Sequence, residues 1–173
     1  GDGQAGQVHG IMLHRGVTNT LVARNNVHDQ PNGAGIAIFD TSGDDVSDNT
    51  IDRALYGIRI SVGSAANTFT NNRVTNRTKY GLYTYKGSDL PAYTTPSGHP
   101  TNNVFTSSSF TASGGNPIKL GETDGTTFDH DTFGGSTLKV DASAGTRING
   151  GVSNGERVAV TGKSAGPTDV TVA

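Results

Sequence analysis

A six-residue pattern of apolar and polar positions recurs along the chain. An apolar residue is followed three positions later by a polar residue and five positions later by a second apolar residue. The polar residues of five copies are separated by 24, 23, 36 and 23 positions. A repeat at such regular intervals predicts that the chain is built from copies of one structural unit. The copies are residues 22–27, 46–51, 69–74, 105–110 and 128–133, and a copy one residue shorter spans 148–152.

A second motif precedes the first four copies and has a similar period. It consists of a glycine, an apolar residue and usually another apolar residue two positions later. Alternation of this kind is typical of a β-strand with one buried face. The motif spans residues 10–13, 35–38, 57–60 and 81–84, and residues 117–120 and 137–140 continue it without the glycine.

Strands and turns that repeat every 22–25 residues or so predict a β-solenoid. Leucine-rich repeats have a similar period, but their leucine pattern is absent here, and propellers of the WD type need a longer period. Connections between parallel strands are right-handed in nearly all proteins. We therefore predict an all-β fold, a right-handed parallel β-helix of six to seven coils.

Composition supports strands and turns and narrows the choice of partners. Glycine accounts for 25 of 173 residues and charged residues for only 16%, which disfavours helices. The net charge is −2, and the chain lacks basic clusters and long apolar runs. We therefore expect neither a nucleic-acid partner nor membrane insertion. Cysteine is absent, which excludes disulfides and thiolate metal sites.

The polar position of the first motif predicts a structural role. In a β-helix coil this residue lies at a corner, where an inward-pointing amide can bond its equivalents in adjacent coils. Asn25, Asn49 and Asn72 would then form a ladder, which Ser108 and Asp131 continue. The alternative is that these residues are ordinary turn formers that face solvent.

We expect residues 1–173 to form one domain with two irregular parts. The 36-residue step contains residues 86–102, which are rich in proline, serine and glycine and predict an excursion loop beside a binding site. After about residue 140 the repeat weakens, so 141–173 are expected to be irregular last coils and a C-terminal cap. No amphipathic helix precedes Gly10, so we expect further coils of a longer chain, another domain or another subunit to cover the first coil.

The second motif brings the candidate chemistry onto one surface. Its apolar residues point inward, so the residues between and after them point outward. Aromatic rings beside cations suit an acidic sugar chain, although an ordinary solvated sheet face carries the same residue types. No pair of residues has metal-ligand spacing and the glycines form no nucleotide motif, so we predict no cofactor and no metal. The outward positions are Met12, His14, Ala37, Phe39, Arg59, Ser61, Tyr83 and Tyr85, with Arg15, Asp40, Val62 and Lys86 at the strand ends.

Four segments carry a resemblance to a known family. The segments "HGIMLHRGVTNTLVARNNVHD", "GAGIAIFD", "YGIRI" and "YGLYTYKGSD" resemble the carbohydrate-binding/sugar-hydrolysis class of parallel β-helix repeats, and in particular periplasmic mannuronan C5-epimerases. The resemblance covers residues 9–90 or so. Alignment of Gly10-Ile11 and of 27–29 without a gap puts His14 on that family's catalytic histidine. Met12 stands where the family has an aspartate, and Asp40 where it has a catalytic arginine.

The resemblance implies action on an alginate-like polyuronate as a C5-epimerase or lyase, in a secreted, periplasmic or cell-surface protein. Both reactions begin when a cation neutralises the carboxylate and a base removes the C5 proton. On this template His14 is the base, Arg59 or Arg15 holds the carboxylate, and Tyr83 or Tyr85 is the acid or a sugar platform. The substrate-binding candidates are Arg15, Phe39, Asp40, Ser61, Tyr85 and Lys86.

Two alternatives stay open, and the sequence does not decide whether the chain is an enzyme. A glycoside hydrolase needs paired carboxylates, and only Asp40 lies on the outward strip, with Asp44 and Asp45 in the next turn. A non-catalytic polysaccharide-binding or structural module needs only the aromatic strip. The residues that replace the family's aspartate and arginine favour the module.

Overall fold

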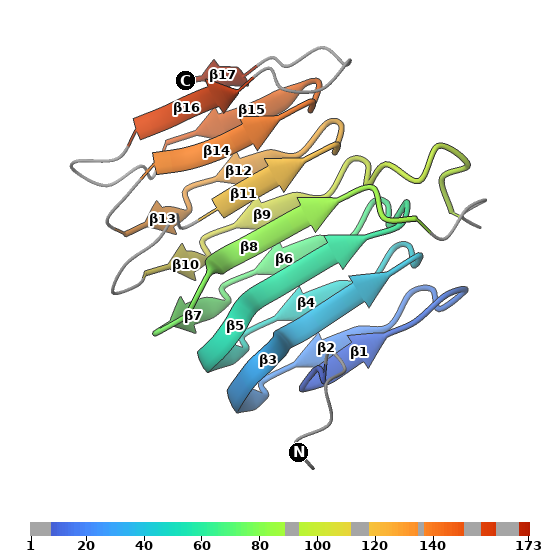
Figure 1. Cartoon of the computed structure of the whole chain (residues 1–173), viewed down its shortest axis with the longest axis vertical. Helices are drawn as coiled ribbons and strands as arrows, with labels where there is room; N and C mark the ends of the chain where they lie inside the picture. The colour runs from blue at the N-terminus through green and yellow to red at the C-terminus, as the bar shows by residue number, and fades with distance from the viewer. Residues whose placement is uncertain (1–7, 89–93, 112–117, 135–136, 151–156, 162–169) are drawn as a thin grey trace.

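The computed structural model shows a parallel β-solenoid whose coils stack along the long axis of the molecule (Figure 1). It describes residues 8–88, 94–111, 118–134, 137–150, 157–161 and 170–173. All strand pairs in these ranges are parallel, and none of these residues is helical. The predicted all-β parallel β-helix is therefore confirmed.

The strands form two sheets that enclose three sides of each coil. The larger sheet covers two sides because its long strands bend around a corner, where the register of β3 against β5 shifts between Gln30 and Ala34. Its ten strands are β1 (Ile11–Leu13), β3 (Asn26–Phe39), β5 (Thr50–Ser61), β7 (Arg73–Thr75), β8 (Tyr80–Tyr85), β10 (Ser109–Phe110), β11 (Ile118–Gly121), β13 (Thr132–Phe133), β14 (Thr137–Asp141) and β16 (Arg157–Thr161).

The smaller sheet closes the third side with one strand from each coil. Its seven strands are β2 (Leu21–Ala23), β4 (Asp45–Ser47), β6 (Thr68–Thr70), β9 (Val104–Thr106), β12 (Thr127–Asp129), β15 (Thr146–Asn149) and β17 (Val170–Val172). We call the opposite side the front side, which consists of β1, the C-terminal halves of β3 and β5, and β8, β11, β14 and β16.

The strand registers reproduce the sequence repeat, but the number of coils is smaller than expected. Val46, Phe69, Phe105 and Phe128 are direct register partners in successive coils. In the described chain five turns have strands on all three sides, because the turns of β14 to β17 have no strand on the side of β7, β10 and β13. The expectation of six to seven coils is therefore slightly too high.

Stacked aromatic rings fill the middle of the core. The ring centroid of Phe105 lies 4.5 Å from that of Phe69 and 5.0 Å from that of Phe128. A second stack joins Phe110 and Phe133 at 6.2 Å. All five rings are at most 1% exposed. Rings thus occupy the columns that valine and isoleucine occupy in the first coils, which keeps the same interior filled along the axis.

The predicted asparagine ladder is confirmed, and its members Asn49 and Asn72 do not face solvent. Asn25 Nδ2 donates to Asn49 Oδ1 at 2.9 Å, and Asn49 Nδ2 donates to Asn72 Oδ1 at 3.0 Å. Asn49 and Asn72 are each 1% exposed. The backbone N–H of Asn72 then donates to Ser108 Oγ, and that of Ser108 to Asp131 Oδ1. A second ladder, absent from our expectations, joins Asp44, Asn67 and Asn103.

Close packing explains the glycine of the second motif. A Cβ atom on Gly10, Gly35 or Gly57 would lie 2.3 Å from a γ-carbon of Val27, Ile51 or Val74, respectively. No real Cβ contact is that short, so these corner positions have room only for hydrogen. Each glycine thus lets the chain bend from one side of the solenoid onto the front side without displacing the core.

The excursion loop lies beside the ends of the front-side strands (Figure 1). Its described residues are 86–88 and 94–102. The N–H of Thr94 donates to Asp40 Oδ1 at 2.9 Å, and the N–H of Gly63 donates to the carbonyl of Gly98 at 2.7 Å. The loop is therefore bonded to the two coils that precede it and borders the outer surface of the front side.

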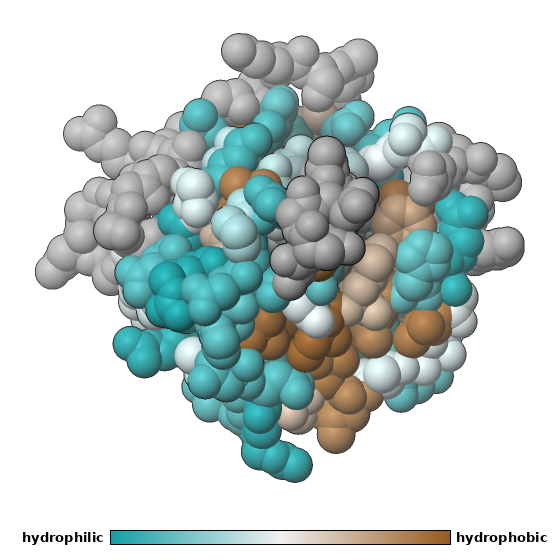
Figure 2. Space-filling model, turned by 60° about the horizontal axis from the view of Figure 1, so that its bottom comes forward, coloured by the Kyte–Doolittle hydropathy of each residue, from teal (hydrophilic) through white to brown (hydrophobic). Residues whose placement is uncertain are grey.

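The two ends of the stack differ in what the structure describes. Strands β15, β16 and β17 continue both sheets, whereas the expected cap falls largely on residues 151–156 and 162–169, outside the described residues. At the other end Val8, Met12 and Leu21 are 41%, 43% and 63% exposed. Figure 2 shows apolar side chains gathered at that end. No described helix is both long and apolar enough to span a bilayer.

Candidate functional site

The outer surface of the front side carries a continuous group of tyrosines and cations, which we call the tyrosine strip. Tyr83 is its centre, because its ring centroid lies 5.1 Å from Tyr56, 5.5 Å from Tyr80 and 5.0 Å from Tyr85. We had predicted Tyr83 and Tyr85 there but not Tyr56 and Tyr80, although each directly precedes a motif glycine. The strip comprises Tyr56, Arg59, Lys79, Tyr80, Tyr83, Tyr85 and Lys119.

Arg59 contributes a partly buried guanidinium to the strip. Its guanidinium carbon lies 4.9 Å from the centroid of the Tyr85 ring, and Nη2 donates to the Tyr85 hydroxyl. The other terminal nitrogen, Nη1, is buried and has no hydrogen-bond partner in the described part of the chain. Burial lowers the pKa of Arg59, yet a guanidinium stays charged at neutral pH. An unpaired buried N–H is costly, so Nη1 would favour an anionic ligand.

The central tyrosine is a proton donor at neutral pH. Burial, and secondarily Tyr56, raise the pKa of Tyr83 above its ordinary value. The phenol therefore stays protonated and can donate a hydrogen bond or a proton but not accept one as a phenolate. Lys119 Nζ lies 5.6 Å from the centroid of the same ring. In the register of the sheet, Arg59 pairs with Tyr83, Tyr83 with Lys119, and Lys119 with Lys139.

His14 and Phe39 lie together on the first two coils. Their rings are stacked, with centroids 4.8 Å apart and planes 9° apart. His14 is exposed, so its ring is accessible to a ligand. The guanidinium carbon of Arg15 lies 5.7 Å from the Phe39 centroid. His14 directly follows β1. In the sheet, β1 is two strands away from β5, which carries Arg59.

The Asp40 side chain is buried and contacts Arg15 and the excursion loop. Its side chain is fully buried, and Oδ2 lies 3.1 Å from Arg15 Nε while Oδ1 accepts the N–H of Thr94. Ser61 is 2% exposed, and its carbonyl accepts the N–H of Asp40 at 3.2 Å. The carbonyl of Lys86 accepts the N–H of Val62 at 3.1 Å. Of the predicted substrate-binding residues, Asp40 and Ser61 thus have almost no surface for a sugar.

Sequence comparison assigns the fold family. A family model described as "Right handed beta helix region" matches residues 5–133, which is well over half of the chain. The chain belongs to this right-handed β-helix family. No curated protein matches the sequence of this β-helix significantly.

Two solved structures resemble the β-helix in fold. The periplasmic alginate epimerase AlgG has a TM-score of 0.50 and 18% sequence identity, and the alignment covers 88% of this chain and 36% of that one. A double mutant of the same epimerase has a TM-score of 0.50 and 16% sequence identity, and the alignment covers 95% of this chain and 36% of that one. The β-helix thus matches about a third of the length of these structures.

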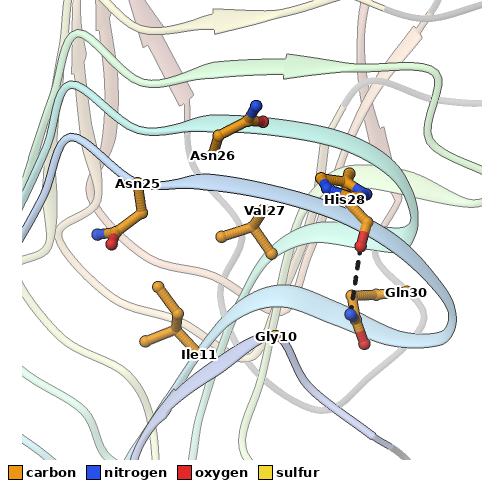
Figure 3. A pocket seen from close by; sticks show the side chains of 7 residues that line it. All are labelled: Gly10, Ile11, Asn25, Asn26, Val27, His28 and Gln30. Atoms are coloured by element: carbon orange, nitrogen blue, oxygen red, sulfur yellow. Dashed lines mark hydrogen bonds between the residues drawn. The ribbon is translucent and has the colours of Figure 1, made fainter.

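A hollow at the first coil of the β-helix is separate from the strip (Figure 3). Core residues Ile11 and Val27 line it together with Asn25, the first member of the ladder, and Gln30 Nε2 donates across it to the His28 carbonyl at 3.3 Å. None of the predicted site residues lines this hollow. Its lining belongs to the core and the ladder of the first described coil, so we assign no substrate to it. In the described ranges no three metal-binding side chains gather in one place.

Arg77 is a buried cation that sequence reasoning did not single out. The side chain is 2% exposed, and none of its three guanidinium nitrogens has a hydrogen-bond partner in the described part of the β-helix. Burial lowers the pKa of Arg77 to about 10. In the sequence it lies between the two motifs of the repeat, where nothing distinguishes it from a surface residue.

Proposed function

We propose that the β-helix binds an acidic, alginate-like polysaccharide on the tyrosine strip and abstracts the C5 proton of a uronate residue, as a C5-epimerase or a lyase. The observation that carries this proposal is the stack of the partly exposed Tyr80, Tyr83 and Tyr85 over the buried Tyr56, with Arg59 against Tyr85. Apolar faces of sugar rings pack on aromatic rings, and cations hold carboxylates.

The order of residues along the strip fits a charged polymer. Neighbouring strands in a sheet lie about 4.8 Å apart, which is close to the length of one sugar unit in an extended chain. Arg59, Lys119 and Lys139 are on one register line with Tyr83 between the first two. A polyuronate along the solenoid axis would thus pass a cation at three of four strands.

The proposed chemistry divides the work among three side chains. Arg59 neutralises the uronate carboxylate with the charge of its guanidinium, which makes the C5 proton more acidic. His14 takes that proton, since a histidine is the usual base near neutral pH. Tyr83, whose pKa is raised, donates a proton to C5 from the opposite face, which gives the epimer. Departure of the 4-O-linked sugar in place of reprotonation at C5 gives the unsaturated product of a lyase.

A non-catalytic binding module is the second candidate. A specific observation favours it: β1, which His14 directly follows, is separated from β5, which carries Arg59, by the whole strand β3, so one sugar has to span that gap for catalysis. The hydrolase alternative has less support, because Asp40 is paired with Arg15 and fully buried. A secreted or periplasmic location belongs to the same proposal, in keeping with the periplasmic epimerase whose fold this chain shares.

The test is incubation with polymannuronate in deuterated water, followed by NMR at C5 and by absorbance near 230–235 nm. Deuterium at C5 without absorbance identifies an epimerase, and new absorbance identifies a lyase. His14→Ala should abolish either signal, whereas His28→Ala, which alters an exposed histidine outside the strip, should retain it. If the chain binds polymannuronate but gives neither signal, it is a non-catalytic binding module. A wild-type chain that neither binds nor turns over polyuronates contradicts the proposal.

A further inference from the structure

Lys79 lies at the edge of the tyrosine strip where β8 begins. Its Nζ is 5.8 Å from the centroid of the Tyr56 ring and 5.9 Å from that of the Tyr80 ring. The backbone N–H of Lys79 donates to the carbonyl of Leu55 at 2.9 Å, which fixes the start of the side chain. The residue is exposed, and the charged end of a lysine side chain stays in water. The ammonium group is therefore beside the rings and accessible to a ligand.

A second lysine contacts the same group of rings from the next coil. Lys119 is the register partner of Tyr83 on the neighbouring strand β11, and its Nζ lies 5.6 Å from the centroid of the Tyr83 ring. The centroid of the Tyr83 ring is in turn 5.5 Å from that of Tyr80. Lys79 and Lys119 are thus beside two rings that are in contact with each other, one lysine where β8 begins and the other on β11.

The charges of these two lysines are not neutralised by a neighbouring acid. Among the residues that the structure describes, neither Lys79 nor Lys119 forms an ion pair. Arg53 on β5, in contrast, is paired with Asp29. Two accessible cations with no carboxylate of their own create a local positive potential, which attracts an acidic ligand.

We propose that Lys79 and Lys119 bind two different carboxylates of one polyuronate chain, which passes Tyr80 and Tyr83 between them. This inference rests on the proposed function and adds to it a second carboxylate site, at Lys79, outside the reacting sugar. The 5.5 Å between the ring centroids of Tyr80 and Tyr83 is close to the length of one sugar unit, so successive carboxylates reach different lysines. The strip thus selects a polymer with carboxylates on successive sugars.

Neutral substitutions test the two lysines separately. In calorimetric titrations with mannuronate oligosaccharides, we expect Lys79→Gln and Lys119→Gln each to bind about fivefold more weakly than wild type, because each loses one exposed ion pair. Lys79→Arg keeps the charge and should stay within about twofold of wild type. Arg73→Gln is the matched control, because it removes one positive charge from an exposed position on β7, outside the front side, and should bind as wild type does.

Two further measurements show whether the lysines serve separate carboxylates. The double variant should bind about twenty-fivefold more weakly, since effects at independent groups add in free energy. Oligosaccharides whose carboxyl groups have been reduced to alcohols should bind equally to Lys79→Gln and wild type. Wild-type affinity of Lys79→Gln for the charged oligosaccharides, an equal loss in Arg73→Gln, or a double variant no weaker than the single ones would overturn the inference while the proposed function stands. No polyuronate binding by the wild-type chain would instead defeat the proposed function itself.

Discussion

At the scale of single residues, Asp131 makes the interior of the solenoid sensitive to pH. It ends the corner ladder, is fully buried, and accepts the N–H groups of Ser108 at 2.6 Å and Asp129 at 3.0 Å. Burial outweighs these two bonds and raises the pKa of Asp131 to about 7. An asparagine at this place, as in Asn49 and Asn72, would carry no charge to desolvate.

The direction of the pH effect follows from the two pKa values of Asp131. The pKa of Asp131 is about 7 in the folded chain, above its ordinary value of 3.8. Burial of this carboxyl therefore costs no extra stability below pH 4 and costs most above pH 7. Stability should therefore fall as the pH rises between these limits. We expect Asp131→Asn to remove this fall and to be more stable at pH 8, by at most about 4 kcal/mol.

Thermal unfolding of both proteins from pH 4 to pH 8 measures this effect. Asp45→Asn is the control, because Asp45 is an exposed carboxylate on β4, three strands away in the smaller sheet, and should leave the slope between pH 4 and 7 as in wild type. If Asp131→Asn keeps the wild-type slope, the carboxyl is not the buried titrating group.

At the scale of strands and ladders, the sequence predicted the parts that repeat. Inward positions must match from coil to coil, since a one-residue slip would turn every side chain to the other face. The registers of the Val46 and Phe69 column and the asparagine ladder could therefore be predicted. The candidate site could be predicted only in part. Arg77 lies outside both motifs, and Asp40 accepts a hydrogen bond from Thr94 of the non-repeating loop.

The ladder gives a second prediction at this scale. Asn49 Oδ1 accepts two hydrogen bonds from Asn25, and Nδ2 donates to Asn72 and to the carbonyl of Val22 at 2.8 Å. In Asn49→Ala these buried partners lose their bonds, so we expect a loss of about 3 kcal/mol in the free energy of unfolding. Urea denaturation measures it. Asn26→Ala, at an exposed position one residue from the ladder, should change stability by less than about 0.5 kcal/mol.

At the scale of the whole molecule, the ends of the stack determine how the solenoid associates with other chains. Strands β1 and β2 each pair on one side only in the described structure, with β3 and β4. Leu21 on β2 is 63% exposed, and Met12 on β1 is 43% exposed. Unpaired strand edges with apolar side chains favour association with another chain.

We therefore expect the 173-residue chain to self-associate through its first coil, and Leu21→Lys to oppose this. A lysine on an edge strand repels a second copy and keeps the edge hydrated. Thr68→Lys is the matched control, because Thr68 is exposed and in the same column on β6, two coils inside the stack. Light scattering across a range of concentrations should give a lower average mass for Leu21→Lys than for wild type and Thr68→Lys. Equal masses for all three proteins would show that this edge is not the interface.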